Sequence, residues 1–374
     1  MMLHRCPSSK LLTCTTDCCP RIYVKYRSYG YGHIIAGNVR VRVMQSVRQS
    51  VSRTVRNWWK TVRKMYKVLL ISGAKDSGRW ILSQTNGGKG VSDCGKYQFY
   101  VNEKIDDPDF VIVRGKSFKK PLTFNVAPEN LILTTSEPYS VLAYPRDYCR
   151  QFGLVCSCQE NLKHKNVKFT QAIIFWFAGV RFDSKGRPSP IKDYDYLKAA
   201  PTPEKKKLIS VVSSVKAFTK GHVDRIRFVE RLKEYYGDKI DVFGRGYNGF
   251  EDKCDVVAPY KYHIVIENTR AKYYWTEKLA DSFICESYPI YYGCTNIGDY
   301  FPEGSYSTID INDFDGAVKV IDRLLAEDAY EQAKPLLKEC KDKVLDEYNL
   351  FNYLARIMDD MNPSLPRRMV TITP

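Results

Sequence analysis

Several features that would place the protein in a common class are missing from its sequence. No apolar run approaches the ~18–20 residues that a transmembrane helix needs. The first thirty residues lack the apolar centre of a secretory signal peptide. The twelve cysteines form no pair of C-x-x-C units, which argues against a zinc knuckle. We therefore expect a cytoplasmic protein with reduced thiols, most of them on small buried side chains.

Nucleotide and metal motifs in their usual spacing are also scarce. The glycine-rich stretch NGGKG at 86–90 does not have the spacing of a P-loop. The DYD at 193–195 resembles a metal-binding D-x-D motif, but it lies in 183–206, a stretch rich in Pro, Lys and Asp that we interpret as an interdomain linker. A solvated turn is the favoured interpretation there, so the sequence predicts no metal site.

Acidic residues are almost absent from one end of the chain. Residues 1–75 contain 15 Lys and Arg residues and one acidic residue, Asp17, and so carry +14 of the total net charge of +16. The other 299 residues contain 43 basic and 41 acidic residues. The body is nearly neutral, which argues against a nucleic-acid-binding core and for a basic N-terminal extension over residues 1–64.

The last part of this extension has the pattern of an amphipathic helix over residues 43–66. Its apolar residues recur every three or four positions, namely Val43, Val47, Val51, Val55, Trp58, Val62 and Met65. Arginine and lysine fill much of the rest, and no acid is present. Two interpretations stay open: peripheral contact with the anionic surface of the inner membrane, or packing on the protein's own globular domain with a solvated basic face.

The body alternates between short apolar runs and helical patterns, which predicts an α/β fold with two domains, over residues 65–190 and 205–361. The first domain has predicted strands at 67–73, 109–115 and 131–137 and an apolar segment at 167–179. The second has predicted strands at 207–214, 239–246, 262–268, 288–293 and 306–311, with helices at 222–237 and 275–287. This order is that of a Rossmann-like nucleotide-binding domain, in which ligands bind at the carboxyl ends of the strands.

One of these strand ends leads into a charged and aromatic stretch, ENTRAKYYWTEKLADSF at 267–283. Thr276 is a suitable N-cap, which places Glu277 and Lys278 in the first turn of the next helix. A helix N-terminus has unpaired N–H groups and a partial positive charge, so it stabilises a diphosphate, and Lys278 adds a full charge. Glu277 is suited to accept hydrogen bonds from ribose hydroxyls. Taken alone, Glu277 is better explained as an acid that favours the first turn.

The same stretch carries a family resemblance. Three segments resemble the signature of glycosyltransferase family 10, the α1,3/1,4-fucosyltransferases, here of bacterial type: ENT at 267–269, YWTEKL at 274–279 and PIYYG at 289–293. The similarity is good over about residues 205–360, weak over 67–200 and absent from 1–64. The resemblance implies a GT-B fold, in which two Rossmann-like domains face a cleft.

The resemblance also implies the chemistry and the residues that carry it. GDP-fucose would bind the second domain and the acceptor sugar the first, in an inverting reaction with no obligatory metal and no other cofactor. By position, Arg225 matches the arginine that contacts the donor diphosphate, and its neighbour Arg227 is the competing choice. The other donor-contacting positions that the resemblance carries over are Asn268, Tyr274, Glu277 and Lys278.

An inverting transfer needs a general base that takes the proton from the acceptor hydroxyl. Family members place a Glu beside a Pro after a strand of the first domain, and Glu137 precedes Pro138 at the end of a predicted strand. We expect Glu137 to be the base, although this sequence has Ser-Glu-Pro where many relatives have Glu-Ser-Pro or Gly-Glu. His263 and His164 are alternative bases by chemistry, but a structural role is favoured for both.

The sequence therefore indicates an inverting fucosyltransferase that moves fucose from GDP-fucose to a GlcNAc-containing glycan, most simply in an α1,3 linkage. Two alternatives remain. One is a GT-B glycosyltransferase that uses another nucleotide sugar. The other is a non-enzymatic, membrane-associated binding protein whose basic end carries the function.

Overall fold

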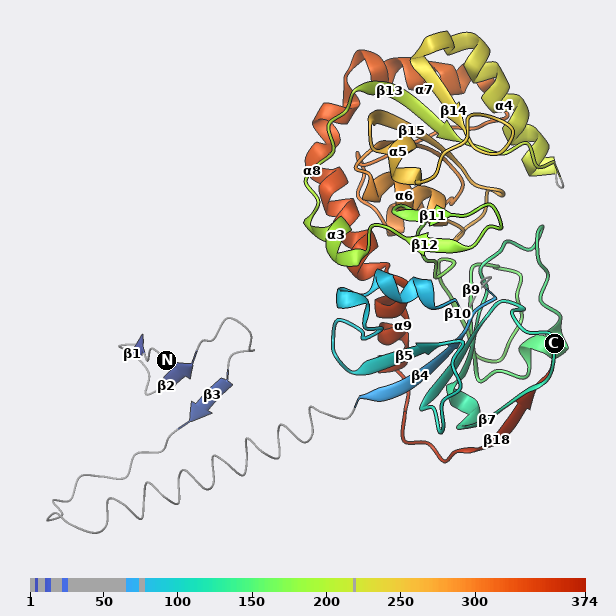
Figure 1. Cartoon of the computed structure of the whole chain (residues 1–374), viewed down its shortest axis with the longest axis vertical. Coiled ribbons are helices and arrows are strands. Elements are labelled where there is room, and N and C mark those ends of the chain that lie inside the picture. The colour runs from blue at the N-terminus through green and yellow to red at the C-terminus, as the bar shows by residue number, and fades with distance from the viewer. Residues whose placement is uncertain (1–3, 6–10, 15–21, 26–64, 74–77, 218–219) are drawn as a thin grey trace, which may run out of the picture. The chain divides into compact units, whose positions relative to one another are not determined.

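The structure, a computed structural model, describes residues 4–5, 11–14, 22–25, 65–73, 78–217 and 220–374 (Figure 1). It divides the chain into two compact units, Met1–Arg63 and Lys64–Pro374. In the first unit, three short strands form an antiparallel sheet: β1 (His4–Arg5), β2 (Leu11–Cys14) and β3 (Ile22–Lys25). All other elements belong to the second unit.

The predicted amphipathic helix over 43–66 lies outside the described residues except for its last two. There the structure corrects the prediction, because Tyr66 is the first residue of β4 (Tyr66–Ile71). Tyr66 pairs with Tyr97 of the neighbouring parallel strand, and its N–H donates to the carbonyl of Lys96 at 2.7 Å. These sheet hydrogen bonds are incompatible with a helix that continues through Tyr66.

The first half of the second unit contains a six-stranded parallel sheet. Its order is β10-β9-β8-β6-β4-β5. Besides β4, its strands are β5 (Tyr97–Val101), β6 (Phe110–Arg114), β8 (Leu131–Thr134), β9 (Leu154–Ser157) and β10 (Val167–Phe169). When the six strands are numbered along the chain, their order across the sheet is 2-1-3-4-5-6. The direction of winding therefore reverses between β4 and β6. The predicted strands at 67–73, 109–115 and 131–137 are confirmed, shorter by one to three residues.

The second half repeats this topology with a five-stranded parallel sheet of order β14-β13-β15-β16-β17. Its strands are β13 (Lys207–Val212), β14 (Ile240–Phe243), β15 (Tyr260–Ile266), β16 (Tyr288–Tyr292) and β17 (Ser307–Thr308). When the five strands are numbered along the chain, their order across the sheet is 2-1-3-4-5. The topological switch point, where the winding reverses, lies between β13 and β15. The α/β fold with two Rossmann-like parallel sheets is therefore confirmed by the topology.

Helices cover the faces of the sheets because their apolar sides join the buried clusters. Those among the described residues are α2 (Arg146–Cys149), α3 (Tyr194–Ala199), α4 (Lys220–Tyr236), α5 (Lys253–Val257), α6 (Glu277–Ile284), α7 (Phe314–Ala326), α8 (Ala329–Asp342) and α9 (Leu350–Asp359). Short 3-10 turns are η1 (Arg79–Gln84), η2 (Asn86–Gly88), η3 (Pro128–Asn130), η4 (Gly237–Lys239) and η5 (Ile297–Asp299). A π-helical turn, η6 (Lys343–Glu347), follows α8.

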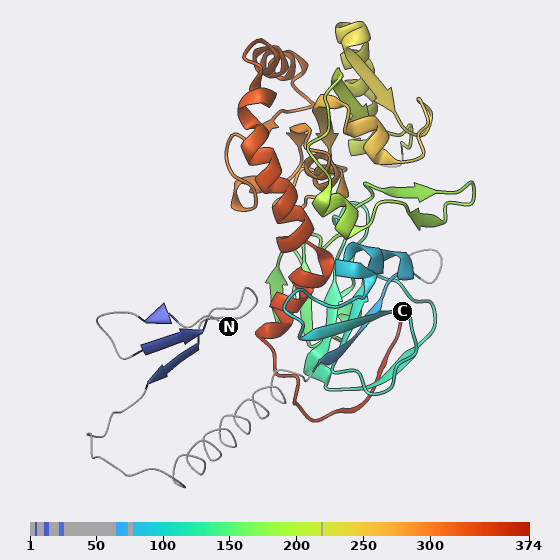
Figure 2. The same cartoon turned by 60° about the vertical axis from the view of Figure 1, so that its left-hand side comes forward.

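The end of the chain returns to the first sheet. The helical run from α8 through η6 to α9 leads down from the second half to the first, as Figure 2 shows. Leu350, Phe351 and Met358 of α9 are buried in one cluster with Val68 and Phe110 of the first sheet. β18 (Arg368–Ile372) then pairs antiparallel with β7 (Leu122–Val126). The two halves thus share one continuous C-terminal segment.

The stretch interpreted as a linker has structure of its own. β11 (Val180–Phe182) and β12 (Pro188–Pro190) form a two-stranded antiparallel sheet, and α3 follows. Asp193 caps α3 by accepting a hydrogen bond from the N–H of Tyr196, and Asp195 accepts one from the N–H of Gly87 at 2.8 Å. Both acids of the DYD sequence are therefore engaged in local and long-range structural bonds.

Two findings bear on the expectations from composition. Among the described helices, none combines the length and the apolar character that crossing a membrane requires. The eight cysteines between residues 78 and 374 are free thiols, and seven of them are buried.

The buried His263 gives a prediction about stability. It is 2% exposed, its Nδ1 lies 2.8 Å from the hydroxyl of Ser210, and burial lowers its pKa to about 3. The unfolded chain takes up this proton near pH 6.5, whereas the folded chain does so only near pH 3. The free energy of unfolding should therefore fall with decreasing pH below about 6.5, by at most about 1.4 kcal/mol per pH unit from this group.

Urea unfolding between pH 7 and pH 4.5 checks this expectation. His263→Asn lacks the titrating group, so its stability should fall less steeply with decreasing pH than that of the wild type. Equal pH slopes for the two proteins would show that His263 does not contribute.

Candidate functional site

Arg225 lies at the switch point of the second sheet. It comes from α4 and is 6% exposed. One terminal amino group donates to the side-chain oxygen of Asn268 at 2.9 Å, beyond the end of β15, and the other to the carbonyl of Ser214 at 3.3 Å, beyond β13. Its Nε is buried and finds no hydrogen-bond partner among the described residues. A guanidinium held by both loops at a switch point is a suitable anchor for an anionic ligand.

The choice between Arg225 and Arg227 is clear in geometric terms. Arg227 is on the same helix but exposed, whereas Arg225 is buried beside Asn268. His222, one turn before Arg225, lies in the same positive environment: burial lowers its pKa, and Arg225, Lys216 and Lys278 lower it further. Sequence reasoning did not single out His222, because a lone histidine in a helix carries no motif.

The charged stretch after β15 forms the N-terminus of α6 as predicted. Thr276 is the N-cap, and its hydroxyl accepts from the N–H of Lys278 at 3.4 Å. Glu267, which is 1% exposed, accepts from the N–H and the hydroxyl of Thr276, each at 2.8 Å. This acid therefore holds the first turn of α6 against the end of β15.

The two charged residues of the first turn form a compact network with Glu267. Lys278 Nζ lies 3.1 Å from Glu277 Oε1, 3.3 Å from Glu267 Oε2 and 3.1 Å from the hydroxyl of Thr276. Burial opposes a charged lysine, but Glu277 and Glu267 outweigh it and raise the pKa of Lys278. Burial also favours a neutral Glu277, yet Lys278 and Lys253 lower the pKa of this carboxyl. Both groups are thus charged at neutral pH.

The aromatic residues of the stretch support the network from inside. Trp275 is fully buried and meets Tyr300, Phe301 and Tyr348 edge to face, with ring centroids 5.2–5.7 Å apart. Tyr274 is 1% exposed, and burial, together with nearby carboxylates, raises its pKa. The aromatic cluster is therefore largely a core that fixes the path of the chain into α6. A donor contact from Tyr274 stays a prediction.

Glu137 brings the first half of the unit to this network. It follows β8, and its backbone carbonyl accepts from the side-chain amide of Gln159 at 2.8 Å. Burial raises the pKa of its carboxyl above the ordinary 4.5, while the Lys278 ammonium acts in the opposite direction. Three residues further on, the hydroxyl of Ser140 lies 2.8 Å from that of Thr269, so the loop after Glu137 contacts the loop that leads into α6. A carboxylate with a raised pKa beside a cationic site fits the requirements of a general base.

Arg114 joins the same cluster, although its sequence context gave no signal. It is the last residue of β6 and pairs in register with Thr134, the last residue of the neighbouring strand β8. Glu137 follows Thr134 by three residues. Its guanidinium lies 4.4 Å from the ring centroid of Phe175, and its Nε donates to the carbonyl of Ile173 at 3.4 Å. Burial lowers its pKa to about 10, so it stays protonated at neutral pH, and it interacts electrostatically with Glu137 and Glu277. Only the register of two parallel strands reveals this placement.

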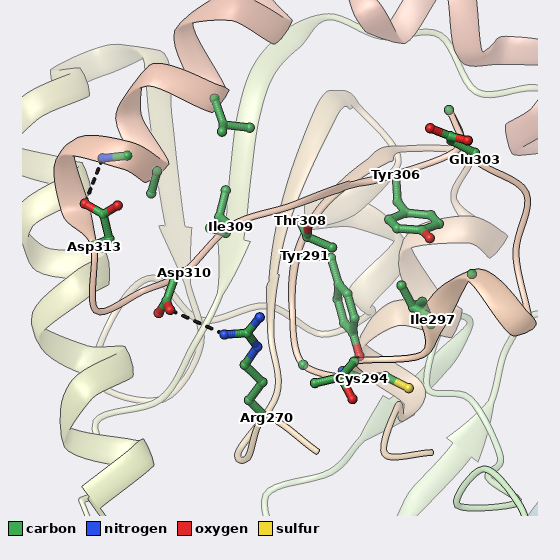
Figure 3. Close-up of a pocket in the computed structure, with 17 residues that line it drawn as sticks. Arg270, Tyr291, Cys294, Ile297, Glu303, Tyr306, Thr308, Ile309, Asp310 and Asp313 are labelled. Atoms are coloured by element: carbon green, nitrogen blue, oxygen red, sulfur yellow. Dashed lines mark hydrogen bonds and ion pairs between the residues drawn. The ribbon is translucent and has the colours of Figure 1, made fainter. Parts of the chain in front are cut away.

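A cavity of about 890 Å³ opens beside the network, at the carboxyl ends of β16 and β17 (Figure 3). Its walls include both apolar and charged residues, namely Arg270, Tyr291, Gly293, Cys294, Thr295, Ile297, Gly298, Glu303, Gly304, Tyr306, Thr308, Ile309, Asp310, Asp313, Gly316, Ala317 and Val320. Arg270 points toward Asp310 at 3.4 Å, and Asp313 caps α7 through the N–H of Gly316. The size and mixed lining are those of a small-molecule site.

Gly293 connects this cavity to the network at α6. A Cβ on Gly293 would lie 2.4 Å from the hydroxyl of Tyr291 and 2.5 Å from Cγ of Glu267. No larger residue fits between them without displacing one of the two, so the glycine lets the cavity wall pack directly on Glu267. The cavity and the charged network are therefore neighbours around one side chain.

The alternative bases lie elsewhere. His263 is buried in β15 against Ser210, which gives it a structural role. His164 lies in the loop before β10, where its Nδ1 is 2.8 Å from the carbonyl of Asn166. Lys278 and Glu277 are among the charged groups that shift the pKa of Glu137, and neither histidine is. In the described part of the chain, no group of three or more His, Cys, Asp or Glu residues has the arrangement of a metal site.

Comparison with known proteins bears on the half that contains this network. Residues 202–333 match the model of glycosyltransferase family 10 (fucosyltransferase), C-terminal part. The family resemblance is thus confirmed over this segment. The α-(1,3)-fucosyltransferase FucT of Helicobacter pylori is 32% identical over 77 residues, which are 20% of this chain and 16% of that protein.

Two solved structures also match this chain. One is an α1,3-fucosyltransferase with GDP-fucose, 17% identical with a TM-score of 0.45, covering 81% of this chain and 93% of that chain. The other is Anabaena Alr3699/HepE in complex with UDP-glucose, 8% identical with a TM-score of 0.44, covering 79% of this chain and 100% of that chain. The assignment of the α/β fold rests on the topology of this chain itself.

Proposed function

We propose that the protein is an inverting fucosyltransferase that transfers fucose from GDP-fucose to a GlcNAc-containing glycan in an α1,3 linkage. The observation that carries the proposal is the hydrogen bond of 2.8 Å between the hydroxyls of Ser140 and Thr269, which joins the loop that follows Glu137 to the loop that leads into the Glu277–Lys278 turn. The family match over residues 202–333 and the α-(1,3) specificity of the Helicobacter relative support the choice of donor and linkage.

The donor diphosphate would lie between Arg225 and the N-terminus of α6. Arg225 supplies a guanidinium from the switch point, and Lys278 supplies an ammonium at the positive end of the α6 dipole. Two fixed cations stabilise the charge that grows on GDP as the sugar leaves. Because these cations perform that task, we propose a reaction with no obligatory metal and no other cofactor.

The nucleoside would extend into the cavity beside Gly293. Glu277 is placed to accept hydrogen bonds from the ribose hydroxyls, and the base would occupy the space lined by Ile309, Thr308 and Val320. Asp310 and Asp313 are carboxylates in the same wall, and a carboxylate is a good acceptor for the N–H groups of guanine. This placement favours a guanine nucleotide over a uracil nucleotide.

Glu137 would act as the general base of the transfer. Its carboxylate takes the proton from the acceptor hydroxyl, the hydroxyl oxygen forms a bond to C1 of fucose, and the bond from C1 to the diphosphate oxygen breaks. GDP then leaves with the bonding electron pair, and the configuration at C1 inverts. Tyr139, which is 61% exposed and two residues after Glu137, offers a ring on which an acceptor sugar can stack.

Two alternatives are kept, each with its own discriminating measurement. A GT-B enzyme with another nucleotide sugar would be protected against thermal unfolding by UDP rather than by GDP. A membrane-associated binding protein without activity would float with anionic vesicles through its basic segment at 43–64 and release no GDP. Localisation in the cytoplasm, peripheral to the inner membrane, belongs to our proposal and is tested by the same flotation with and without residues 1–64.

The decisive experiment is turnover of GDP-fucose with N-acetyllactosamine and related acceptors. The proposal expects release of GDP that depends on the acceptor and a fucosylated product with inverted configuration at C1. A protein that neither binds GDP-fucose nor releases GDP with any of these acceptors would refute it.

Lys278→Ala should weaken binding of GDP about 10- to 100-fold, because a charge-assisted hydrogen bond contributes about 1.5–3 kcal/mol. Isothermal titration with GDP measures the effect. Lys319→Ala, an exposed lysine of α7, is the matched control and should bind GDP like the wild type. Equal affinity of Lys278→Ala and wild type would remove Lys278 from the donor site.

Glu137→Gln should lower kcat/KM for transfer about 100- to 10,000-fold and leave the affinity for GDP within about twofold, because the amide cannot take a proton. In the wild type, the acidic limb of kcat/KM should lie above pH 4.5, since burial raises the pKa of Glu137 and only the ionised form is active. Glu129→Gln, an exposed acid of the same half, is the control. Near-normal turnover by Glu137→Gln would show that another group is the base.

Thr308→Trp should fill the cavity and abolish the protection by GDP. Thr308 is exposed at the end of β17, the edge strand of its sheet, so the larger side chain enters the cavity without disturbing the core. Thermal unfolding with and without GDP checks this, and Thr308→Ser should keep the protection. Undiminished protection of a folded Thr308→Trp protein would place the nucleoside outside this cavity.

A further inference from the structure

A second charged cavity lies in the first half of the unit, and the fucosyl transfer proposed above does not use it. Its volume is about 450 Å³, and its lining residues are Arg146, Arg150, Lys163, His164 and Lys165. We propose that this cavity, which we name the basic pocket, binds the phosphate group of a soluble phosphate-bearing ligand. The inference does not depend on the proposed transfer reaction.

The walls of the basic pocket are fixed by buried neighbours. Arg146 is the first residue of α2 and Arg150 follows its end, and Tyr148 and Cys149 of this helix are buried in one apolar cluster with Leu162. Leu162 precedes the basic run at 163–165, so the apolar anchor holds that loop against α2. The end of the loop is tied down as well, because the side-chain amide of Asn166 donates to the carbonyl of Gly153 at 3.0 Å. Both basic segments are thus held in place side by side.

The charge of the basic pocket is largely uncompensated. Four of its five lining residues are lysines or arginines, and no acid is among the described residues that line it. In the described part of the chain the carboxylate paired with them is Asp147, which lies 2.9 Å from Arg150 and is itself 89% exposed. Like charges gathered at one concave surface repel each other, so an anion that enters relieves a repulsion as well as gaining contacts.

His164 supplies an independent sign of a missing ligand. Its Nδ1 lies 3.1 Å from the N–H of Asn166, which can donate to it. Its Nε2 is buried and has no hydrogen-bond partner among the described residues. Nδ1 also lies 2.8 Å from the carbonyl of Asn166, so the loop engages Nδ1, and Nε2 lacks a partner whichever ring nitrogen carries the proton. Buried polar atoms in native proteins nearly always have a partner, so the unpartnered Nε2 indicates that a polar group of a ligand completes the cavity.

The chemistry and size of the basic pocket favour phosphate over other anions. An arginine guanidinium can donate two parallel hydrogen bonds to two oxygens of one phosphate. The lysine ammonium groups add positive charge opposite the phosphate, which carries nearly two negative charges. A volume of about 450 Å³ equals that of roughly fifteen liquid waters, which leaves room for a sugar or a second phosphate beside the first. The lining contains no large apolar side chain that would insert into a membrane, so we commit to a soluble ligand rather than a lipid surface.

Titration calorimetry with inorganic phosphate and with pyrophosphate, at an ionic strength held constant with chloride, tests the proposal on the full chain. The double variant Lys163→Ala/Lys165→Ala should bind at least about tenfold more weakly than the wild type. The matched control Lys119→Ala/Lys120→Ala removes two exposed lysines of the same half outside the pocket and should bind within twofold of the wild type. Equal affinity of the two double variants would overturn the proposal.

A second comparison separates the basic pocket from the donor site, which also attracts phosphate. Binding should persist in Lys278→Ala, and its loss there would overturn the assignment to the basic pocket. Arg146→Gln replaces an exposed residue outside the apolar cluster, so it should reproduce the weakening without affecting the fold.

Flotation with phosphatidylserine and phosphatidylcholine vesicles tests whether the ligand is a membrane surface instead. Loss of binding to phosphatidylserine in the double variant, with no binding of soluble phosphate by the wild type, would replace the soluble ligand with a membrane surface.

Discussion

The hydrogen bonds between Glu267 and Thr276 are the constraint on which the site depends. They close the loop of ten residues between the end of β15 and the start of α6, and they fix the first turn of that helix in space. A fully buried carboxylate is costly unless it is bonded, and here it receives the Thr276 N–H, the Thr276 hydroxyl and the charge of Lys278. The position of every donor in the first turn follows from this arrangement, and so does the need for a glycine at 293 on its other side.

The second requirement is that the two halves of the unit hold a constant relation, and α6 serves this purpose too. Asp281 of α6 is fully buried, pairs with Lys253 at 2.6 Å and accepts from the N–H groups of Phe177 and Ala178, each at 2.9 Å. The same short helix therefore presents Lys278 at its first turn and holds the segment that leads from the first half to the second. A further bond between the hydroxyls of Ser140 and Thr269, at 2.8 Å, joins the loops that follow Glu137 and Asn268.

The contrast between Thr276 and Arg114 shows what the sequence determines and what it does not. The N-cap, the first-turn charges and the strands around them follow from local rules that a window of twenty residues contains, and all of these were confirmed. Arg114 enters the site only because β6 and β8 are adjacent in register, which is a property of the whole sheet. The return of α9 to the first sheet and the cavity beside Gly293 are likewise products of tertiary packing, as is the place of Tyr66 in β4.

The ion pairs of Lys278 suggest how the proposed donor site would respond to its ligand. All three N–H groups of this ammonium have oxygen partners, so a diphosphate must displace one of them. Glu267 is held by Thr276 and cannot leave, whereas the Glu277 side chain is 23% exposed and is free to turn outward. The group released, Glu277, is the one proposed to accept the ribose hydroxyls. Under the proposed function, binding of the two groups would therefore be coupled: the phosphate replaces Glu277 at Lys278, and the released Glu277 binds the ribose. A free phosphate, which lacks the ribose, would gain less binding free energy at Lys278.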